Sequence, residues 1–170
     1  MKTILSFIFL FIGLSTAFAQ SYVVVASESR VFDQPNVKSY PTTNTSGADV
    51  ILVRGMVFKS IGTPQNGWDK IEYTPGLNAF VLQSQLASAS MLATPRAGVF
   101  NVANNSATKL TVTSEGSSWK ASDGTSDYPG TLADNTVVFT DKFGNMAYSL
   151  VVMDGKPIVF SYNNDITKFF

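Results

Sequence analysis

The stretch from Val50 to Phe80, VILVRGMVFKSIGTPQNGWDKIEYTPGLNAF, decides the fold. It begins with two short apolar runs that meet at Arg54-Gly55, where the glycine permits a bend that a side chain would resist. Asn66-Gly67 favours a positive φ and closes a hairpin. From Trp68 to Tyr73 apolar and charged residues alternate, as in a strand with one wet face. The stretch therefore predicts short, strongly bent strands.

The first 19 residues have the pattern of a secretory signal peptide. Lys2 gives a positive start, residues 4–14 are almost wholly apolar, and Ala17-Phe18-Ala19 matches the A-x-A cleavage signature. The apolar run is shorter than the ~20 residues that a membrane-spanning helix needs. We therefore predict cleavage after Ala19, no transmembrane segment in the mature chain, and a periplasmic or secreted location.

The composition argues against several classes of function. The chain has 12 basic and 12 acidic residues, no cysteine and no histidine. Balanced, unclustered charge argues against a nucleic-acid partner, which requires grouped Lys and Arg. Without cysteine there is no disulfide, and without His or Cys the common nucleophilic triads and zinc sites cannot form. We expect a non-enzymatic protein without a cofactor; a hydrolase that uses carboxylates alone is the remaining catalytic alternative.

Four short motifs lie in the first half of the mature chain. They are Val31-Phe32-Asp33-Gln34-Pro35, Leu52-Val53-Arg54-Gly55-Met56-Val57, Asn66-Gly67-Trp68-Asp69-Lys70-Ile71, and Ala79-Phe80-Val81 with Leu86. Together they make residues 22–86 resemble a bacterial SH3-like domain, although that family usually closes with Gly-Trp-Val where this chain has Ala79-Phe80. The resemblance implies a small β-barrel that recognises cell-wall peptide or a protein partner. The amidase domains that often accompany it use a catalytic Cys and His, which this chain lacks.

The second half reads as a series of strands and tight turns. Ala87-Ser88-Ala89-Ser90 begins a small, polar stretch that predicts a linker. Beyond it, alternating strands and the hairpin signal Asp154-Gly155 indicate an antiparallel β-meander, either a small barrel or a sandwich. We therefore predict an all-β protein with a signal peptide (1–19), an SH3-like β-barrel domain (20–86), a linker (87–95) and an antiparallel β domain (96–170).

Three aromatic residues are the candidate ligand contacts: Tyr40, Trp68 and Tyr73. Aromatic side chains offer large rigid faces and lose little entropy on binding. Tyr40 lies in the polar loop Ser39–Asp49, while Trp68 follows the Asn-Gly turn. Core packing is the alternative role for Trp68 and the expected role of Phe80.

Aspartates in the second half do not match a calcium loop. Asp123, Asp127, Asp134 and Asp141 lack the D-x-D-x-D-G spacing and the following Glu. Such residues are common in turns, so we expect no metal site.

These observations predict an exported, non-enzymatic binding protein of the bacterial cell envelope. Its partner would be a cell-wall peptide or an envelope protein, recognised through the SH3-like domain. The alternative is a small secreted inhibitor or immunity-type protein that acts on an enzyme through an exposed loop, either 39–49 or 122–130.

Overall fold

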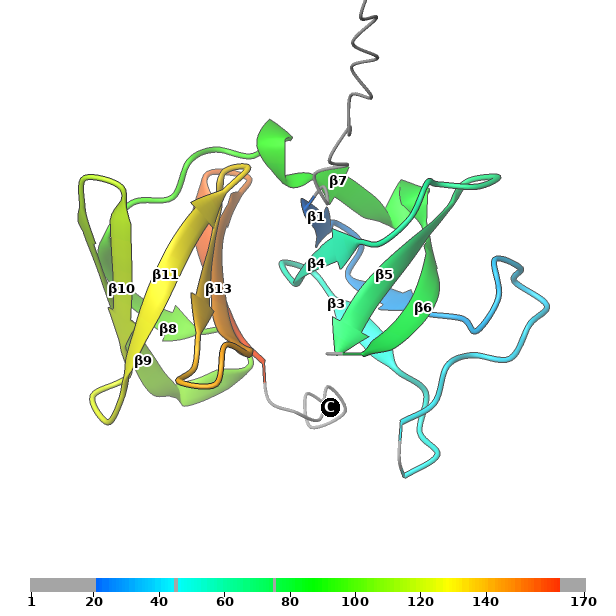
Figure 1. The fold of residues 1–170 in the computed structure, drawn as a ribbon, viewed down its shortest axis with the longest axis horizontal. Helices are drawn as coiled ribbons and strands as arrows, with labels where there is room; N and C mark the ends of the chain where they lie inside the picture. The colour runs from blue at the N-terminus through cyan, green and yellow to red at the C-terminus, as the bar shows by residue number, and fades with distance from the viewer. Residues whose placement is uncertain (1–20, 45, 75, 163–170) are drawn as a thin grey trace, which may run out of the picture.

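The computed structural model consists almost entirely of β-strands, arranged as a sheet and a barrel that lie side by side (Figure 1). It describes residues 21–44, 46–74 and 76–162, so the expected signal peptide lies outside the described residues. No helix in these ranges is long and apolar enough to cross a membrane. The all-β fold class is confirmed.

The first half forms a five-stranded antiparallel sheet in the order β6-β5-β4-β1-β7, and a separate pair, β2 and β3. The strands are β1 (Ser21–Val24), β2 (Glu28–Arg30), β3 (Ile51–Val53), β4 (Val57–Ser60), β5 (Trp68–Thr74), β6 (Leu77–Leu82) and β7 (Leu86–Ser88). Asn66 (φ 51°) and Gly67 (φ 83°) make the predicted turn before β5. Phe32 and Phe80 exchange two backbone hydrogen bonds, of 2.9 and 2.8 Å, which join the segment after β2 to β6.

The second half is a closed barrel of seven strands that follow one another around the ring. They are β8 (Gly98–Val102), β9 (Asn105–Glu115), β10 (Ser118–Ser122), β11 (Asp127–Ala133), β12 (Thr136–Thr140), β13 (Met146–Met153) and β14 (Lys156–Ser161). An up-and-down meander with an odd number of strands has its first and last strands pointing the same way. The closing pair, β8 with β14, is accordingly parallel, whereas all other neighbours are antiparallel. Of the two predicted architectures, the barrel is the one that forms.

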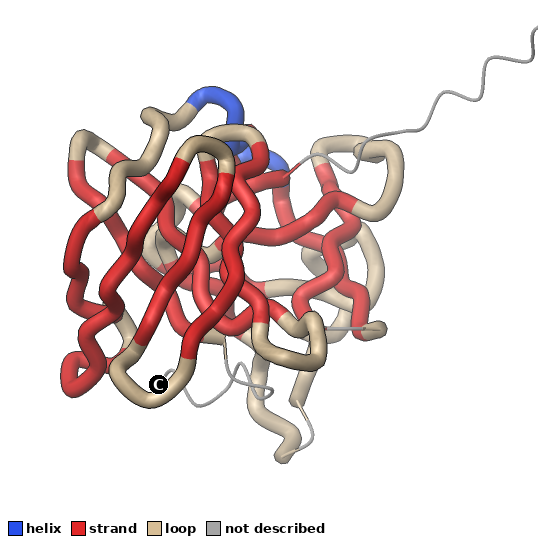
Figure 2. The backbone as a smooth tube through the Cα atoms, turned by 60° about the vertical axis from the view of Figure 1, so that its left-hand side comes forward, coloured by secondary structure: helices blue, strands red, loops and turns tan. Residues whose placement is uncertain are grey.

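Two short 3-10 helices, η1 (Gln83–Gln85) and η2 (Ala89–Met91), lie where the chain passes from the sheet to the barrel (Figure 2). The segment 87–95 was expected to be a linker, because Ala87-Ser88-Ala89-Ser90 has no bulky residue to bury. Its first residues instead belong to β7, which pairs with β1, and the side chain of Ala89 is fully buried. This segment therefore packs against the rest of the protein.

Each half has its own hydrophobic core, and a third cluster lies between them. The third cluster brings Val23 and Val57 of the sheet together with Val151 and Met153 of the barrel. Phe160, in the last barrel strand, belongs to the core of the sheet. The two halves thus bury apolar surface against each other, which is the main favourable term in such packing.

Gly130 in the barrel lies at a position with no room for a side chain. It lies between Trp119 on β10 and Phe139 on β12, and a Cβ at position 130 would lie 2.6 Å from the ring of fully buried Phe139. We predict that Gly130→Ala destabilises the protein by about 1–3 kcal/mol, because overpacking forces side chains away from their preferred rotamers. The measurement is the free energy of unfolding in urea. Gly62→Ala is the matched control, since nothing lies within 4 Å of that position; equal losses in both variants would contradict the prediction.

Candidate functional site

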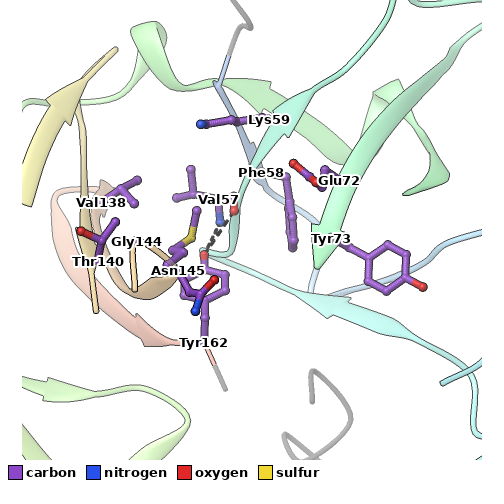
Figure 3. Close-up of a pocket in the computed structure, with 11 residues that line it drawn as sticks. Val57, Phe58, Lys59, Glu72, Tyr73, Val138, Thr140, Gly144, Asn145 and Tyr162 are labelled. Carbon is purple, nitrogen blue, oxygen red and sulfur yellow. Dashed lines mark hydrogen bonds between the residues drawn. The ribbon is translucent and has the colours of Figure 1, made fainter. Parts of the chain in front are cut away.

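A cleft of about 290 Å³ lies between the sheet and the barrel (Figure 3). Strands β4 and β5 supply one wall, and β12, the β12–β13 hairpin and the residue after β14 supply the other. The lining residues are Val57, Phe58, Lys59, Glu72, Tyr73, Val138, Thr140, Gly144, Asn145, Met146 and Tyr162. The walls are mixed, with apolar side chains and a few polar groups, as is typical of ligand sites.

The cleft opens where the pairing of β4 with β5 comes to an end. The two strands pair only at Ser60↔Ile71 and Lys59↔Glu72. After Glu72 the chain turns into β6, and the β5–β6 pairing is irregular between Glu72 and Thr74. The backbone of Val57, the first residue of β4, has no ladder partner in β5.

The hydroxyl of Tyr162 forms the backbone hydrogen bonds with Val57 that a neighbouring strand would otherwise form. It accepts a hydrogen bond from Val57 N at 2.6 Å and lies 3.3 Å from Val57 O, to which it donates. Ser149 Oγ is 3.0 Å away and supplies the third contact. A tyrosine hydroxyl has one proton and can accept further bonds, so these three contacts fit its capacity. One side chain of the barrel thus satisfies both backbone groups of a sheet residue.

The ring of Tyr162 is held by two other aromatic side chains. Its centroid lies 6.5 Å from that of Phe58 and 5.6 Å from that of Phe160, both in edge-to-face geometry. Burial raises the pKa of Tyr162 from 10.0 to about 12, although the hydrogen bonds with Ser149 and Val57 oppose the increase. The hydroxyl is therefore neutral and fixed in position at physiological pH.

Two charged residues of the sheet lie at the cleft. Lys59 extends across its upper edge toward Val138 (Figure 3). Glu72 is opposite Lys59 in the strand register, but its Oε1 accepts the Gly76 N–H at 2.7 Å. Within the described part of the chain, no carboxylate lies within ion-pair distance of the Lys59 ammonium.

The barrel wall of the cleft is a pre-organised hairpin tip. Asp141 Oδ1 accepts the backbone N–H groups of Phe143 and Asn145 at 2.8 and 2.9 Å, and Oδ2 accepts Asn145 Nδ2 at 3.2 Å. Desolvation opposes ionisation of Asp141, but the hydrogen bonds from Asn145, Phe143 and Gly144 outweigh it and lower the pKa. Phe143 is held outward, 76% exposed, with the Lys142 ammonium 5.0 Å from its ring centroid.

The three predicted contact residues lie in different environments. Tyr40 is 86% exposed on the loop before β3, whereas Trp68 is only 7% exposed and packs edge-on against Phe32 at 5.5 Å. Tyr73 lines the cleft, but its ring points away from Tyr162 (Figure 3) and packs against the core of the sheet. Only one of the three therefore belongs to the cleft.

Apart from Tyr73, the residues that line the cleft were not singled out from the sequence. Phe143 does not line the cleft but is next to Gly144, which does, and it offered a signal, because a bulky apolar side chain in an otherwise polar turn is unexpected. Tyr162 offered none, since its partner Val57 is 105 residues away in the chain. Lys59 looked like any charged residue on the wet face of a strand.

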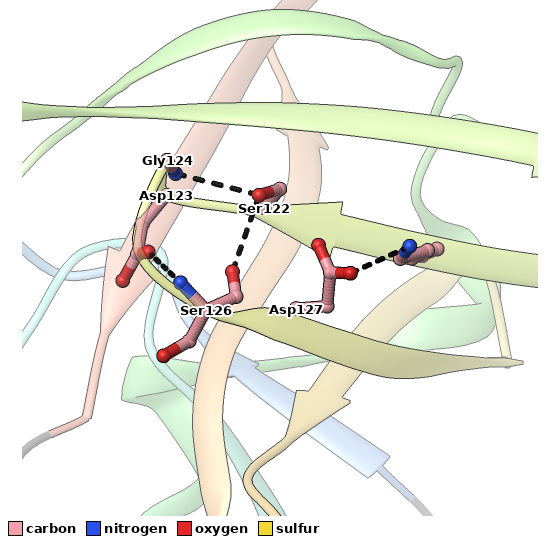
Figure 4. Close-up of polar contacts among 6 residues, drawn as sticks. Ser122, Asp123, Gly124, Ser126 and Asp127 are labelled. Carbon is pink, nitrogen blue, oxygen red and sulfur yellow. Dashed lines mark hydrogen bonds and ion pairs between the residues drawn. The ribbon is translucent and has the colours of Figure 1, made fainter.

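The aspartate-rich turn between β10 and β11 serves the barrel itself. Asp123 accepts the Ser126 N–H at 2.8 Å (Figure 4), the Thr125 N–H at 2.8 Å, and the hydroxyls of Tyr128 and Tyr148 at 2.8 and 3.3 Å. Burial opposes ionisation, but these bonds outweigh it and lower the pKa of Asp123. All four acceptor positions are occupied within the protein. Among the described residues, no group of three or more acidic side chains gathers as a metal site would.

Comparison with other proteins adds no relative to this picture. No family model, no curated protein and no solved structure matches the chain. The function is therefore argued from the cleft and its chemistry.

Replacing Tyr162 with Phe tests the role of its hydroxyl. The variant leaves the N–H and C=O of Val57 without this partner in a half-buried place. We expect the free energy of unfolding to fall by about 1–3 kcal/mol. Tyr40→Phe removes a hydroxyl from an exposed side chain and should change stability by less than about 0.5 kcal/mol. Unchanged stability of Tyr162→Phe, measured by chemical denaturation, would refute the assigned role.

The raised pKa of Tyr162 predicts a specific loss of stability in alkali. Below pH 10 the phenol is protonated in both states, so its contribution is fully present; between pH 10 and about 12 the unfolded chain ionises first and stability falls. Tyr162→Phe should flatten the dependence of unfolding free energy on pH in this window by up to about 1.4 kcal/mol per pH unit. Parallel curves for the two proteins from pH 10 to 12 would contradict this.

Proposed function

We propose that this chain is an exported, non-enzymatic binding protein of the bacterial cell envelope, which recognises cell-wall peptide or a protein partner. The observation that carries the proposal is the cleft between the sheet and the barrel. It is concave, has apolar walls and has a few polar groups pointing into it, which is the usual composition of a small-ligand site.

The chemistry of the lining supports binding rather than catalysis. Among the described residues that line the cleft, Glu72 is the single carboxylate, and its Oε1 accepts the Gly76 N–H. Glycoside hydrolysis by carboxylates requires a pair across the scissile bond. Tyr162 is a poor acid or base near neutrality, because burial raises its pKa to about 12.

The SH3-like assignment of the first half is part of the same proposal. Its support is the arrangement of short, bent strands, in which Gly55 (φ 94°) bends the chain before β4 and the bonds between Phe32 and Phe80 join the β2–β3 region to β6. Such joining curls a sheet toward a small barrel. In this proposal the SH3-like half contributes β4 and β5 to the ligand site, and the second half contributes the opposite wall.

The exposed loop between β2 and β3 favours a second candidate function. Tyr40 and Val37 are 86% and 63% exposed on this loop. Large exposed apolar and aromatic side chains are typical anchors of protein interfaces. A secreted inhibitor or immunity-type protein would use this loop to contact an enzyme.

Sedimentation of the mature chain with purified peptidoglycan tests the first proposal. We expect retention that is unaffected by Tyr40→Ala, because the loop residue does not line the cleft. The envelope-protein version predicts instead a specific cross-link between the chain and a purified envelope protein. The proposal is refuted if the chain is not retained on peptidoglycan and forms no specific cross-link with an envelope protein, at low or at moderate salt.

The inhibitor alternative makes the opposite prediction for Tyr40. A secreted enzyme that copurifies in stoichiometric amount and loses activity on addition of this chain would support it. In that case Tyr40→Ala should weaken inhibition by about tenfold or more, as loss of an interface anchor does.

A further inference from the structure

Of the described residues that line the cleft, Lys59 is the one cation. Its side chain leaves β4 on the exposed side and reaches over the cleft toward the barrel (Figure 3). The ion pairs recorded in the described residues involve other cations: Arg30 with Asp49, Arg54 with Asp154, and Lys120 with Asp127. The Lys59 ammonium therefore presents a positive charge to whatever enters the cleft.

Among the described residues, no neighbouring carboxylate forms an ion pair with this ammonium. Glu72 is the closest acidic residue in the register, and its Oε1 is engaged by the Gly76 N–H. On the opposite wall, Asp141 has both oxygens engaged by the hairpin tip that it organises. An anionic group of a ligand can therefore pair directly with the Lys59 ammonium through a charge-assisted hydrogen bond.

The remaining walls suit a short, uncharged portion of a ligand. Val138 and Met146 provide apolar surface on the barrel wall, whereas Val57 and Phe58 of the sheet are almost fully buried. Asn145 is anchored through its Nδ2 by Asp141, and no hydrogen bond to its Oδ1 is recorded among the described residues, so this oxygen can accept an amide N–H. With about 290 Å³, the cleft is at the small end of ligand sites and holds a short segment.

We propose that the cleft binds the free carboxylate of a short peptide, with Lys59 as the residue that recognises the carboxylate. The adjoining small apolar side chain lies against Val138 and Met146, and a peptide N–H of the ligand donates to Asn145. This inference rests on the proposed binding function and names the ligand chemistry of the same site. A carboxylate is favoured over a phosphate because one lysine is a point charge, whereas phosphate sites usually combine several donors or an arginine fork.

The test uses two probes of the same length and side chains, one ending in a charged carboxylate and the other in a neutral amide. Acetyl-Ala-Ala with a free carboxylate and acetyl-Ala-Ala-amide are titrated into the mature chain, and binding is followed by the backbone NMR signals of Val57 and Asn145. We expect the carboxylate form to bind at least tenfold more tightly, because a charge-assisted contact is lost in the amide. Each probe is made in L,L and D,D forms; preference for D,D indicates a cell-wall source and preference for L,L a protein source, and either supports the proposal.

Two variants assign the effect to Lys59. Lys59→Met keeps the apolar stem but removes the charge, so the carboxylate and amide forms should then bind equally weakly. Lys156→Met makes the same change on exposed Lys156, at the start of β14, and should retain the tenfold preference. Thermal unfolding of both variants confirms that they are folded before the titrations are compared.

The inference is overturned if the unmodified chain binds both probes equally, if neither probe shifts the cleft signals, or if Lys59→Met retains the preference. These results are separate from the test of the proposed function. Retention on peptidoglycan without carboxylate preference would remove this inference and leave the envelope function standing. A preference for the carboxylate probe without binding to peptidoglycan or an envelope protein would support this inference and refute the envelope function.

Discussion

The hydrogen bonds between the Tyr162 hydroxyl and the backbone of Val57 are the interaction on which the arrangement of the two halves depends. Strand β4 loses its β5 partner before it reaches Val57, and a backbone donor and acceptor left without partners away from water would cost several kcal/mol. The barrel supplies the missing partner through one side chain. Tyr162 directly follows β14, the last barrel strand. Closing the barrel therefore also positions the hydroxyl that satisfies the backbone of Val57 in the sheet.

Other contacts also join the two halves, but they contribute unequally to stability. Gly55 lies so close to Ile158 that a Cβ at position 55 would be 2.8 Å from its Cγ2, which indicates tight packing of the β3–β4 turn on β14. Arg54 and Asp154 form an ion pair of 2.5 Å at the same end. This pair is solvent-exposed and contributes about 0–1 kcal/mol, so the apolar cluster and the Tyr162 bonds dominate.

Local patterns in the sequence predicted the strands and turns well, but they could not predict contacts between residues far apart in the chain. Asn66-Gly67 and Asp154-Gly155 adopt positive φ at the predicted turns, because turn chemistry is set by adjacent residues. Barrel closure was open between two architectures, since strand pairing across the ring is not encoded locally. The candidate site was less predictable: burial of Trp68 and exposure of Tyr40 depend on tertiary packing, and the contact of Tyr162 with Val57 spans 105 residues.

The shortness of the β4–β5 ladder accounts for much of the chemistry of the cleft. The two strands pair at Lys59↔Glu72 and Ser60↔Ile71, and the backbone of Val57 bonds to the Tyr162 hydroxyl instead of to a strand. In a ladder, opposite charges on facing residues such as Lys59 and Glu72 usually stabilise each other. Here Oε1 of Glu72 accepts the Gly76 N–H at 2.7 Å, and no ion pair with Lys59 forms among the described residues. The Lys59 ammonium at the cleft is therefore open to a charged group of a ligand as far as the described part of the chain goes.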